Sequence, residues 1–382
     1  MPVSIGSRVT LGLEGFDKLL RSLRDDGREL IGPTVRDGAI VLDSIDGIAD
    51  LPRGVGDEQA PGHYRLKGRG DEALFGFAVP QHSFKRELLV PRVTLVKLRR
   101  SAKGLAIEEP PRPERRVAFV GVRACEIVAI DTQDRVLRDG PYADADYAAR
   151  REQIFILAVQ CGSPSGTCFC VSMGTGPRAK AGFDLAATEV LAPEHIFIVE
   201  VGTEAGRTIL ERVCSRAATT DEEQAAEDVV NVATTRMGRT MDQTDIRDLL
   251  MSNLEHPRWD DVAERCLGCA NCVLACPTCF CTSVEDTSDI SGNEATRTRR
   301  WDACFTMDFA YLHGDGVRPS LRARYRQWLT HKVATWHDQF GMSGCVGCGR
   351  CITWCPVGID ITEEVAAIRR EPGKVGHDDG RP

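Results

Sequence analysis

The sequence lacks the features that would place the protein in a membrane, on a secretion pathway or on nucleic acid. Apolar runs such as Val117–Val122 and Ile154–Val159 are far shorter than the roughly 20 apolar residues that span a bilayer. The N-terminal residues show no basic segment followed by an apolar stretch, so we expect no signal peptide. Lys and Arg number 48 against 56 Asp and Glu, and a net charge of -8 argues against non-specific binding to phosphates. We therefore expect a cytoplasmic protein with neither a nucleic-acid nor a membrane partner.

The sequence also lacks the two best-known nucleotide-binding fingerprints. It contains no Walker loop and no G-x-G-x-x-G motif. The segments Gly174-Thr-Gly176 and Gly121-Val-Arg123 could each cradle a phosphate, the second at the start of a predicted helix. A tight turn is the more frequent use of such glycines, because glycine permits backbone conformations that other residues avoid. We therefore assign no flavin or nicotinamide site and no catalytic residue to this chain.

Cysteine, by contrast, is abundant, with 16 residues, and half of them form two runs of identical spacing. Each run reads C-x2-C-x2-C-x3-C-P, first from Cys266 to Pro277 and then from Cys345 to Pro356. This is the spacing of two-cluster ferredoxins, in which the fourth cysteine of each run ligates the cluster of the other run. The pattern predicts two [4Fe-4S] clusters, the first held by Cys266, Cys269, Cys272 and Cys355, and the second by Cys345, Cys348, Cys351 and Cys276.

Two other uses of these cysteines fit the spacing less well. Structural zinc sites typically take two separated cysteine pairs, with or without histidine, rather than three closely spaced cysteines and a fourth before proline. Disulfide frameworks belong to short secreted chains, whereas this chain has 382 residues and no secretory start. The iron–sulfur interpretation is therefore the one that the sequence favours.

A third cluster is a possibility raised by the remaining cysteines. Six of them stand in marked settings, in a Gly-rich loop, in a repeated Thr-Cys-Phe-Cys motif or after a tryptophan: Cys161, Cys168, Cys170, Cys279, Cys281 and Cys304. Cys125 and Cys214 lie in apolar helical sequence instead. Free cysteines also pack as small hydrophobic residues, which is the competing explanation. The sequence predicts a possible third cluster drawn from the six and does not determine its ligands.

The hydrophobic pattern predicts an α+β protein with two structured parts. Residues 8–30 resemble an amphipathic helix, and short β-prone runs follow at 39–42, 74–77 and 93–98. Continuous apolar strands at 116–121, 153–159 and 195–201 alternate with helical sequence, which indicates a sheet covered on both faces. We expect an α/β domain over 1–240 with a cysteine-rich loop at 161–177, a mostly helical ferredoxin domain over 241–370, and a disordered tail at 371–382.

The two cysteine runs are separated by a long insert of 68 residues, 277–344. The sequence predicts an acidic loop at 285–294, a basic patch at Arg297, Arg299 and Arg300, and an amphipathic helix at 321–340. The basic residues could dock an acidic partner, although a solvated face is the more frequent explanation. Lys85, near turn residues, is expected to be an ordinary surface or loop residue.

Several of these motifs together resemble a known family. They are Gly121-Val-Arg-Ala-Cys125, the loop from Cys161 through Met-Gly-Thr-Gly-Pro177, Gly182-Phe-Asp-Leu185, Cys276-Pro-Thr-Cys279, Trp301-Asp-Ala-Cys304 and the second ferredoxin run. This combination resembles the β subunit of cytoplasmic sulfhydrogenases and is similar to the corresponding electron-transfer component of anaerobic sulfite reductase, with the Met-Gly-Thr-Gly-Pro and Gly-Phe-Asp-Leu text closer to the hydrogenase group.

The resemblance implies an electron-transfer subunit of a cytoplasmic oxidoreductase complex. Its partners would be a flavin subunit that reacts with NAD(P) and the subunits of a NiFe hydrogenase, or a sirohaem sulfite reductase subunit in the alternative. The residues agree, because iron–sulfur clusters carry single electrons and cannot by themselves perform hydride chemistry. A stand-alone flavin-binding reductase and a protein with purely structural clusters are the competing classes.

Overall fold

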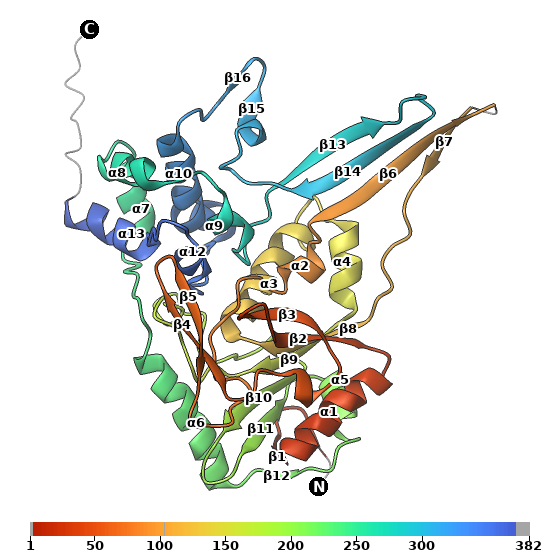
Figure 1. Cartoon of the computed structure of the whole chain (residues 1–382), viewed down its shortest axis with the longest axis vertical. Coiled ribbons are helices and arrows are strands. Elements are labelled where there is room, and N and C mark those ends of the chain that lie inside the picture. Colours follow the sequence, from red (N-terminus) through yellow and green to blue (C-terminus); the bar gives the residue numbers. More distant parts are fainter. Residues whose placement is uncertain (1–2, 103, 372–382) are drawn as a thin grey trace.

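The computed structural model of the chain describes residues 3–102 and 104–371 (Figure 1). The tail expected at 371–382 therefore lies outside the described residues, apart from Glu371. Within the described ranges, no helix is both long enough and apolar enough to cross a bilayer.

An eight-stranded mixed sheet organises the N-terminal part of the chain. The strands β2, β8, β9 and β10 run parallel to one another in the centre, and the flanking strands are antiparallel. The order across the sheet is β12 (Arg216–Ala217), β1 (Arg8–Gly12), β11 (Ile196–Val201), β10 (Leu185–Val190), β9 (Ile154–Val159), β8 (Val117–Val122), β2 (Glu29–Arg36) and β3 (Ala39–Ile45).

Both faces of this sheet are buried, as the continuous apolar strands predict. In β8 and β9, alternate side chains join different hydrophobic cores: Val120 and Leu157 enter one core, whereas Phe119 and Ile156 enter the other. Helix α1 (Leu13–Asp25) packs its apolar stripe into the first core, and α3 (Ala124–Leu137) and α4 (Ala145–Glu152) cover the second. Helices α5 (Glu204–Leu210) and α6 (Thr220–Thr235) close the remaining edges of the sheet (Figure 1).

Two sequence-based expectations in this part are wrong. The helix expected over 8–30 is a strand, β1, followed by α1 and then by the first residues of β2, because Arg8–Gly12 pairs antiparallel with β11. Residues 74–77 are not a strand although they are buried. The Glu189 carboxylate accepts hydrogen bonds from the amides of Leu74 at 2.7 Å and Phe75 at 2.9 Å, so a side chain satisfies donors that a neighbouring strand would otherwise take.

The C-terminal part is mostly helical, as expected. It contains α7 (Ile246–Met251), α8 (Arg258–Arg265), α9 (Asn271–Leu274), α10 (Leu321–Thr330), α11 (Trp336–Phe340), α12 (Arg350–Thr353) and α13 (Ile361–Arg370). A π-helical segment, His331–Thr335, joins α10 to α11, so the helix expected over 321–340 is continuous. A core of its own gathers Trp259, Tyr325, Trp328 and Ile368.

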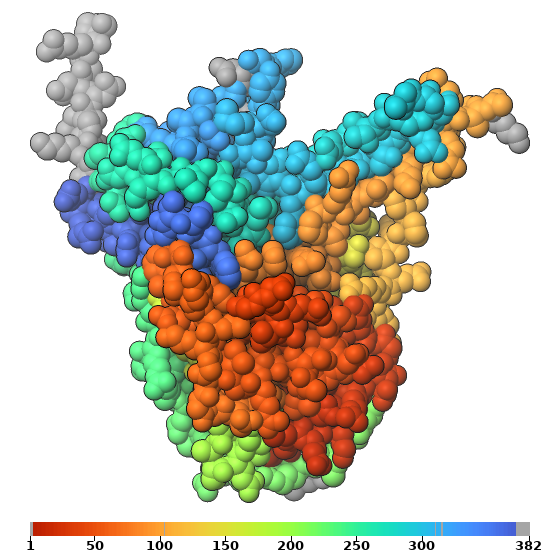
Figure 2. All heavy atoms as spheres, viewed as in Figure 1, coloured from red at the N-terminus to blue at the C-terminus, as the bar shows by residue number. Residues whose placement is uncertain are grey.

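The long insert contributes to an arm that stands clear of the body (Figures 1 and 2). The hairpin β13 (Thr282–Ser288) and β14 (Glu294–Trp301) pairs with β6 (Arg92–Ser101), which pairs in turn with β7 (Gly104–Glu108). The acidic segment at 285–294 is therefore mainly hairpin rather than loop. Its basic neighbours are paired within the arm, since Arg297 contacts Asp286 at 2.7 Å and Arg300 contacts Glu285 at 3.0 Å.

Smaller elements complete the fold and join its two parts. A second hairpin, β4 (Val55–Ala60) and β5 (His63–Gly68), reaches the second cysteine run, where the amide of Gly62 donates to the Ile352 carbonyl at 3.1 Å. The others are α2 (Lys85–Leu88), β15 (Tyr311–Leu312) and β16 (Asp315–Gly316). Because one core draws on residues 9–213 and another mainly on residues from 241 onward, we retain a division near residue 240 as a proposal.

Candidate functional site

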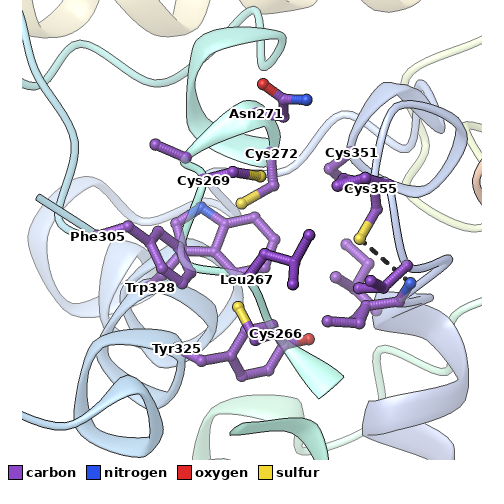
Figure 3. A pocket seen from close by; sticks show the side chains of 15 residues that line it. Cys266, Leu267, Cys269, Asn271, Cys272, Phe305, Tyr325, Trp328, Cys351 and Cys355 are labelled. Atoms are coloured by element: carbon purple, nitrogen blue, oxygen red, sulfur yellow. Dashed lines mark hydrogen bonds between the residues drawn. The ribbon is translucent and has the colours of Figure 1, made fainter. Parts of the chain in front are cut away.

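The first group of predicted cluster ligands lines one small cavity (Figure 3). Cys266 ends α8, Cys269 lies in the loop that follows, and Cys272 lies in α9, while Cys355 arrives from the second run just after α12. Cys351, predicted to serve the other cluster, also borders this cavity. The cavity measures about 30 Å³, and aromatic and aliphatic side chains form much of its remaining wall: Phe305, Tyr325, Trp328 and Ile361.

The second group of predicted ligands gathers beside the first. Cys276, which follows α9, and Cys345 and Cys348, which precede α12, are each only 8% exposed. Burial raises the pKa of Cys345 to about 12, and the nearby sulfurs of Cys348 and Cys276 add to that rise. Cys351 lies close to the same three residues. Each fourth cysteine of a run therefore lies among the cysteines of the opposite run.

Glycines at matching positions shape the two runs. Gly268 and Gly347, each just before the second cysteine of its run, have φ values of +62° and +64°, which L side chains rarely adopt. The turn aims each glycine amide at the sulfur two residues earlier, at 3.4 Å from Cys266 and 3.5 Å from Cys345. The Ile359 amide reaches Cys355 in the same way, at 3.3 Å. Such hydrogen bonds to sulfur are among the factors that set the potential of an iron–sulfur cluster.

The residues present fit two cubane clusters better than single metal ions. All 16 cysteines are free, and each predicted set of four converges from two distant stretches of chain. Among residues 3–102 and 104–371, no three Cys, His, Asp or Glu side chains converge closely enough to hold one metal ion. That wider spacing suits a cube whose four corners each take one thiolate. The assignment of individual ligands stays a prediction.

Two buried lysines lie against the second group. Lys332 is 4% exposed, and its ammonium donates to Cys276 Sγ at 3.1 Å. Burial alone would lower the pKa of Lys332, but the neighbouring sulfurs, that of Cys276 first, hold it well above its ordinary value. Lys85 is 5% exposed and donates to three backbone carbonyls, including that of Cys276 at 2.8 Å. Burial lowers the pKa of Lys85, since neutral carbonyls compensate its charge less than sulfur does.

The six cysteines considered for a third cluster do not form one group. Cys279, Cys281 and Cys304 line a cavity of about 420 Å³ together with His331 and Lys332. A hydrogen bond from the Cys304 thiol lowers the pKa of Cys281 to about 7, with help from the charge of Lys332. The other three of the six line a separate small cavity, which Cys125 and Cys348 also border: Cys161, Cys168 and Cys170. Cys214 is exposed and belongs to neither group.

The two glycine segments considered for phosphate binding have different surroundings. The Arg123 side chain is 3% exposed and donates to the carbonyls of Phe75, Phe77 and Gln160, so its guanidinium serves the interior of the protein. Gly174 and Gly176 border a cavity of about 510 Å³. Other residues around that cavity include the first residue of α3 and two basic residues: Ala124, Arg178 and Lys180.

Several buried polar residues beside these centres escaped the sequence-based predictions. The expectation that Lys85 is an ordinary surface or loop residue is wrong, because it is buried against the first cysteine run. Lys332 and Arg350 were not singled out at all. Arg350 is 0% exposed and pairs at 2.7 Å with Glu126, 2% exposed, on α3. One signal was available for Lys332, since it lies within the helix that separates the two runs in sequence.

Comparisons with known proteins agree with the cysteine pattern. Residues 265–359 match the family model described as a 4Fe-4S dicluster domain. The chain is 29% identical over 291 residues to the sulfhydrogenase 2 subunit beta of Pyrococcus furiosus, which covers 75% of this chain and 84% of that protein. A solved structure of the F420-reducing [NiFe] hydrogenase complex from Methanosarcina barkeri matches 60% of this chain and 91% of its own at 9% identity, with a TM-score of 0.27 that is too low to support an argument.

Proposed function

We propose that this homologue of a sulfhydrogenase β subunit, with its 4Fe-4S dicluster domain, relays electrons between a flavin subunit that reacts with NAD(P) and a NiFe hydrogenase module. The chain is an iron–sulfur electron-transfer protein with two [4Fe-4S] clusters. The proposal adds the direction of the relay, the partners and the residues that hold the clusters.

The observation that carries the proposal is the adjacency of the two cysteine groups. Cys351, assigned to one group, borders the cavity of the other, so the two centres lie next to each other inside one fold. When bound, [4Fe-4S] clusters supply one-electron transfer at potentials set by their surroundings. Adjacent centres of this kind support electron passage along the chain, which is what a relay subunit requires.

The chain's own residues hold these centres and keep water from them. The side chains of Trp328 and Tyr325 are 3% and 2% exposed, and both border the first cavity. The amides of Gly268 and Gly347 donate to ligand sulfurs, and the Lys332 ammonium donates to Cys276. These contacts neutralise part of the negative charge that four thiolates bring into the interior.

An exposed apolar rim beside the first cavity supports docking of a partner. Cys269 is exposed, and Leu267 and Val357, which border the same cavity, are 64% and 37% exposed (Figure 3). A partner that covers this rim would approach a cluster ligand directly. The projecting arm offers a second surface of both charges (Figure 2), but its arginines are already paired within the chain. The predicted docking of an acidic partner on these arginines is therefore not part of our proposal.

The cytoplasmic location remains part of the proposal. Sixteen free cysteines are compatible with a reducing compartment, in which thiols stay available for metal binding. We therefore propose that the complex works in the cytoplasm.

Two alternatives remain distinguishable. The terminal partner could be a sirohaem sulfite reductase subunit, which is what the second part of the resemblance implies. A stand-alone flavin reductase would instead use the cavity of about 510 Å³ beside Gly174, Gly176 and the start of α3, where Arg178 and Lys180 offer positive charge for a phosphate.

Anaerobic purification of the native complex through a tag on this chain tests the proposed partners. We expect a subunit that contains flavin and reacts with NAD(P), together with large and small NiFe hydrogenase subunits. A sirohaem protein in place of the hydrogenase subunits would replace the first choice by the second. Recovery of the chain alone with bound flavin would contradict the relay.

A further inference from the structure

Four cysteines outside the two ferredoxin groups surround one enclosed cavity. Cys125 lies in the first turn of α3, directly after β8, and Cys161 lies two residues after β9. Strands β8 and β9 are parallel neighbours, so their carboxyl ends bring these two residues to the same edge of the sheet. Cys168 and Cys170 arrive on the loop that follows Cys161. The topology therefore assembles four thiols from three segments of chain.

The size and lining of this cavity match those of the first ferredoxin group. Its volume is about 20 Å³, against about 30 Å³ for the cavity around Cys266, Cys269, Cys272 and Cys355. Cys125, Cys168 and Cys170 are each at most 7% exposed. Apart from Arg123 and the sulfur-bearing residues, the lining is apolar: Ala78, Val79, Ala124, Pro164 and Pro177. The site is thus an interior sulfur pocket rather than a surface group.

A buried cation borders the pocket without a matching ion pair in the described part of the chain. The guanidinium of Arg123 donates to three neutral carbonyls. Asp57 is near enough to interact electrostatically, but its carboxylate accepts from the Ala78 amide at 3.0 Å and from the Gln59 side chain at 2.6 Å. Buried charges are costly unless compensated. Thiolates bound to iron in the pocket would supply negative charge beside Arg123.

The loop that carries Cys168 and Cys170 is fitted closely against the second ferredoxin run. The amide of Phe169 donates to the Gly347 carbonyl at 2.9 Å, and the Thr175 hydroxyl donates to the Val346 carbonyl at 2.6 Å. A Cβ on Gly347 would meet the Cys170 amide nitrogen at 2.7 Å. Cys348, a predicted ligand of the second cluster, borders the sulfur pocket as well. The pocket therefore lies directly beside the proposed relay.

We propose that Cys125, Cys161, Cys168 and Cys170 bind a third [4Fe-4S] cluster that extends the relay beyond the second ferredoxin group. Its place in the relay rests on the proposed function, whereas the binding itself does not. Sites with four sulfur ligands select zinc or iron–sulfur clusters. Zinc is disfavoured because no three of the described ligand side chains converge on a single ion. Each thiol would lose its proton on binding iron.

Iron content of the full chain, purified anaerobically in its complex, tests this site. Three clusters require at least roughly twelve iron atoms per chain, and two require roughly eight, since each holds four. We expect Cys125→Ala and Cys161→Ala each to lose roughly four iron atoms while the signals of the two ferredoxin clusters persist in Mössbauer and electron paramagnetic resonance spectra.

Matched variants distinguish this site from the others. Cys214→Ala, at an exposed cysteine, should keep all iron, and Cys304→Ala should keep the iron that Cys161→Ala loses. Unchanged iron in both pocket variants would overturn the proposal, as would loss of that same iron in Cys304→Ala but not in Cys161→Ala. If the pocket variants do not fold, the wild-type count decides, because roughly eight atoms contradict the third site. Cys355→Ser separately probes the ferredoxin clusters, so a failure there bears on the proposed function alone.

Discussion

At the scale of single residues, Lys332 links the helical insert to the proposed electron path. Its ammonium is buried and contacts Cys276 Sγ at 3.1 Å, the Thr278 hydroxyl at 3.2 Å and the Gly344 carbonyl at 3.3 Å. The Trp328 ring lies 5.9 Å from the same ammonium. A positive charge and a hydrogen bond at a ligand sulfur both favour the more negative, reduced state of a cluster. Lys332 is therefore expected to raise the potential of the second centre.

Replacing Lys332 by Met removes that charge while keeping an unbranched side chain of similar length. A hydrogen bond to a charged group contributes about 1.5–3 kcal/mol, and for one electron about 1.4 kcal/mol corresponds to roughly 59 mV. We expect the midpoint potential of one cluster to fall by on the order of 60–130 mV in a redox titration followed by electron paramagnetic resonance. Lys97→Met, at an exposed position on the arm, should leave both potentials in place. Equal potentials in the Lys332→Met and wild-type proteins would remove Lys332 from this role.

The sequence identifies only part of the centres at this scale. The eight ferredoxin cysteines are predictable because three ligands of each cluster sit within a few residues of one another. Cys125 was not, since a cysteine in apolar helical sequence looks like a packing residue until β8 and β9 are seen to bring it beside Cys161. Lys332 and Arg350 were missed for the same reason, because their partners lie 56 and 224 residues away in sequence.

At the scale of elements, the loop 161–177 and the second cysteine run fit together only through glycine. Gly349 has φ of +78°, and a Cβ there would lie 2.5 Å from the Thr167 carbonyl oxygen. The Thr167 and Thr353 hydroxyls lie 2.8 Å apart across the same contact. Gly341, at the end of α11, has a similar φ of +70° but nothing within 4 Å of the equivalent position. The two glycines thus separate backbone strain from a backbone clash.

Gly349→Ala should destabilise the protein more than Gly341→Ala. The left-handed backbone costs each alanine about 1–2 kcal/mol, and the clash at residue 349 should add roughly 1–3 kcal/mol. Anaerobic urea unfolding, followed by loss of the cluster absorbance, compares the midpoints of both variants with the wild type. Faster proteolysis within 161–177 is expected for Gly349→Ala alone. Equal midpoints for the two variants would mean that the contact yields without cost.

Element prediction from sequence succeeded where one hydrophobic period ruled a segment. The strands β8, β9 and β11 are continuous apolar runs, and all three were expected within a residue or two. Residues 285–294 were expected to be a loop because their composition is acidic and polar. They form most of a hairpin because β14 pairs with β6, about 200 residues earlier, with Arg297 opposite Val96. Pairing over that distance leaves no local signal.

At the scale of the whole molecule, the chain crosses repeatedly between its two parts. Cys276 and Cys355 each lie among the cysteines of the opposite run, and the buried pair of Arg350 and Glu126 joins the second run to α3. The arm adds strands from both parts (Figure 1). The N-terminal sheet therefore positions the cysteine-rich loop, and the helical part positions the two ferredoxin centres, so that all of them adjoin. This arrangement is what the relay proposal requires of the complete chain.

The most direct test of the relay is the response of the purified chain to different reductants. Under anaerobic conditions it should accept electrons from dithionite and show [4Fe-4S] signals by electron paramagnetic resonance. With NADH or NADPH alone it should remain oxidised, and adding its flavin-bearing partner should restore reduction by the pyridine nucleotide. A purified chain that retains flavin and is reduced directly by NADH or NADPH would contradict the account and would point to the cavity beside Gly174 and Gly176 as a flavin site.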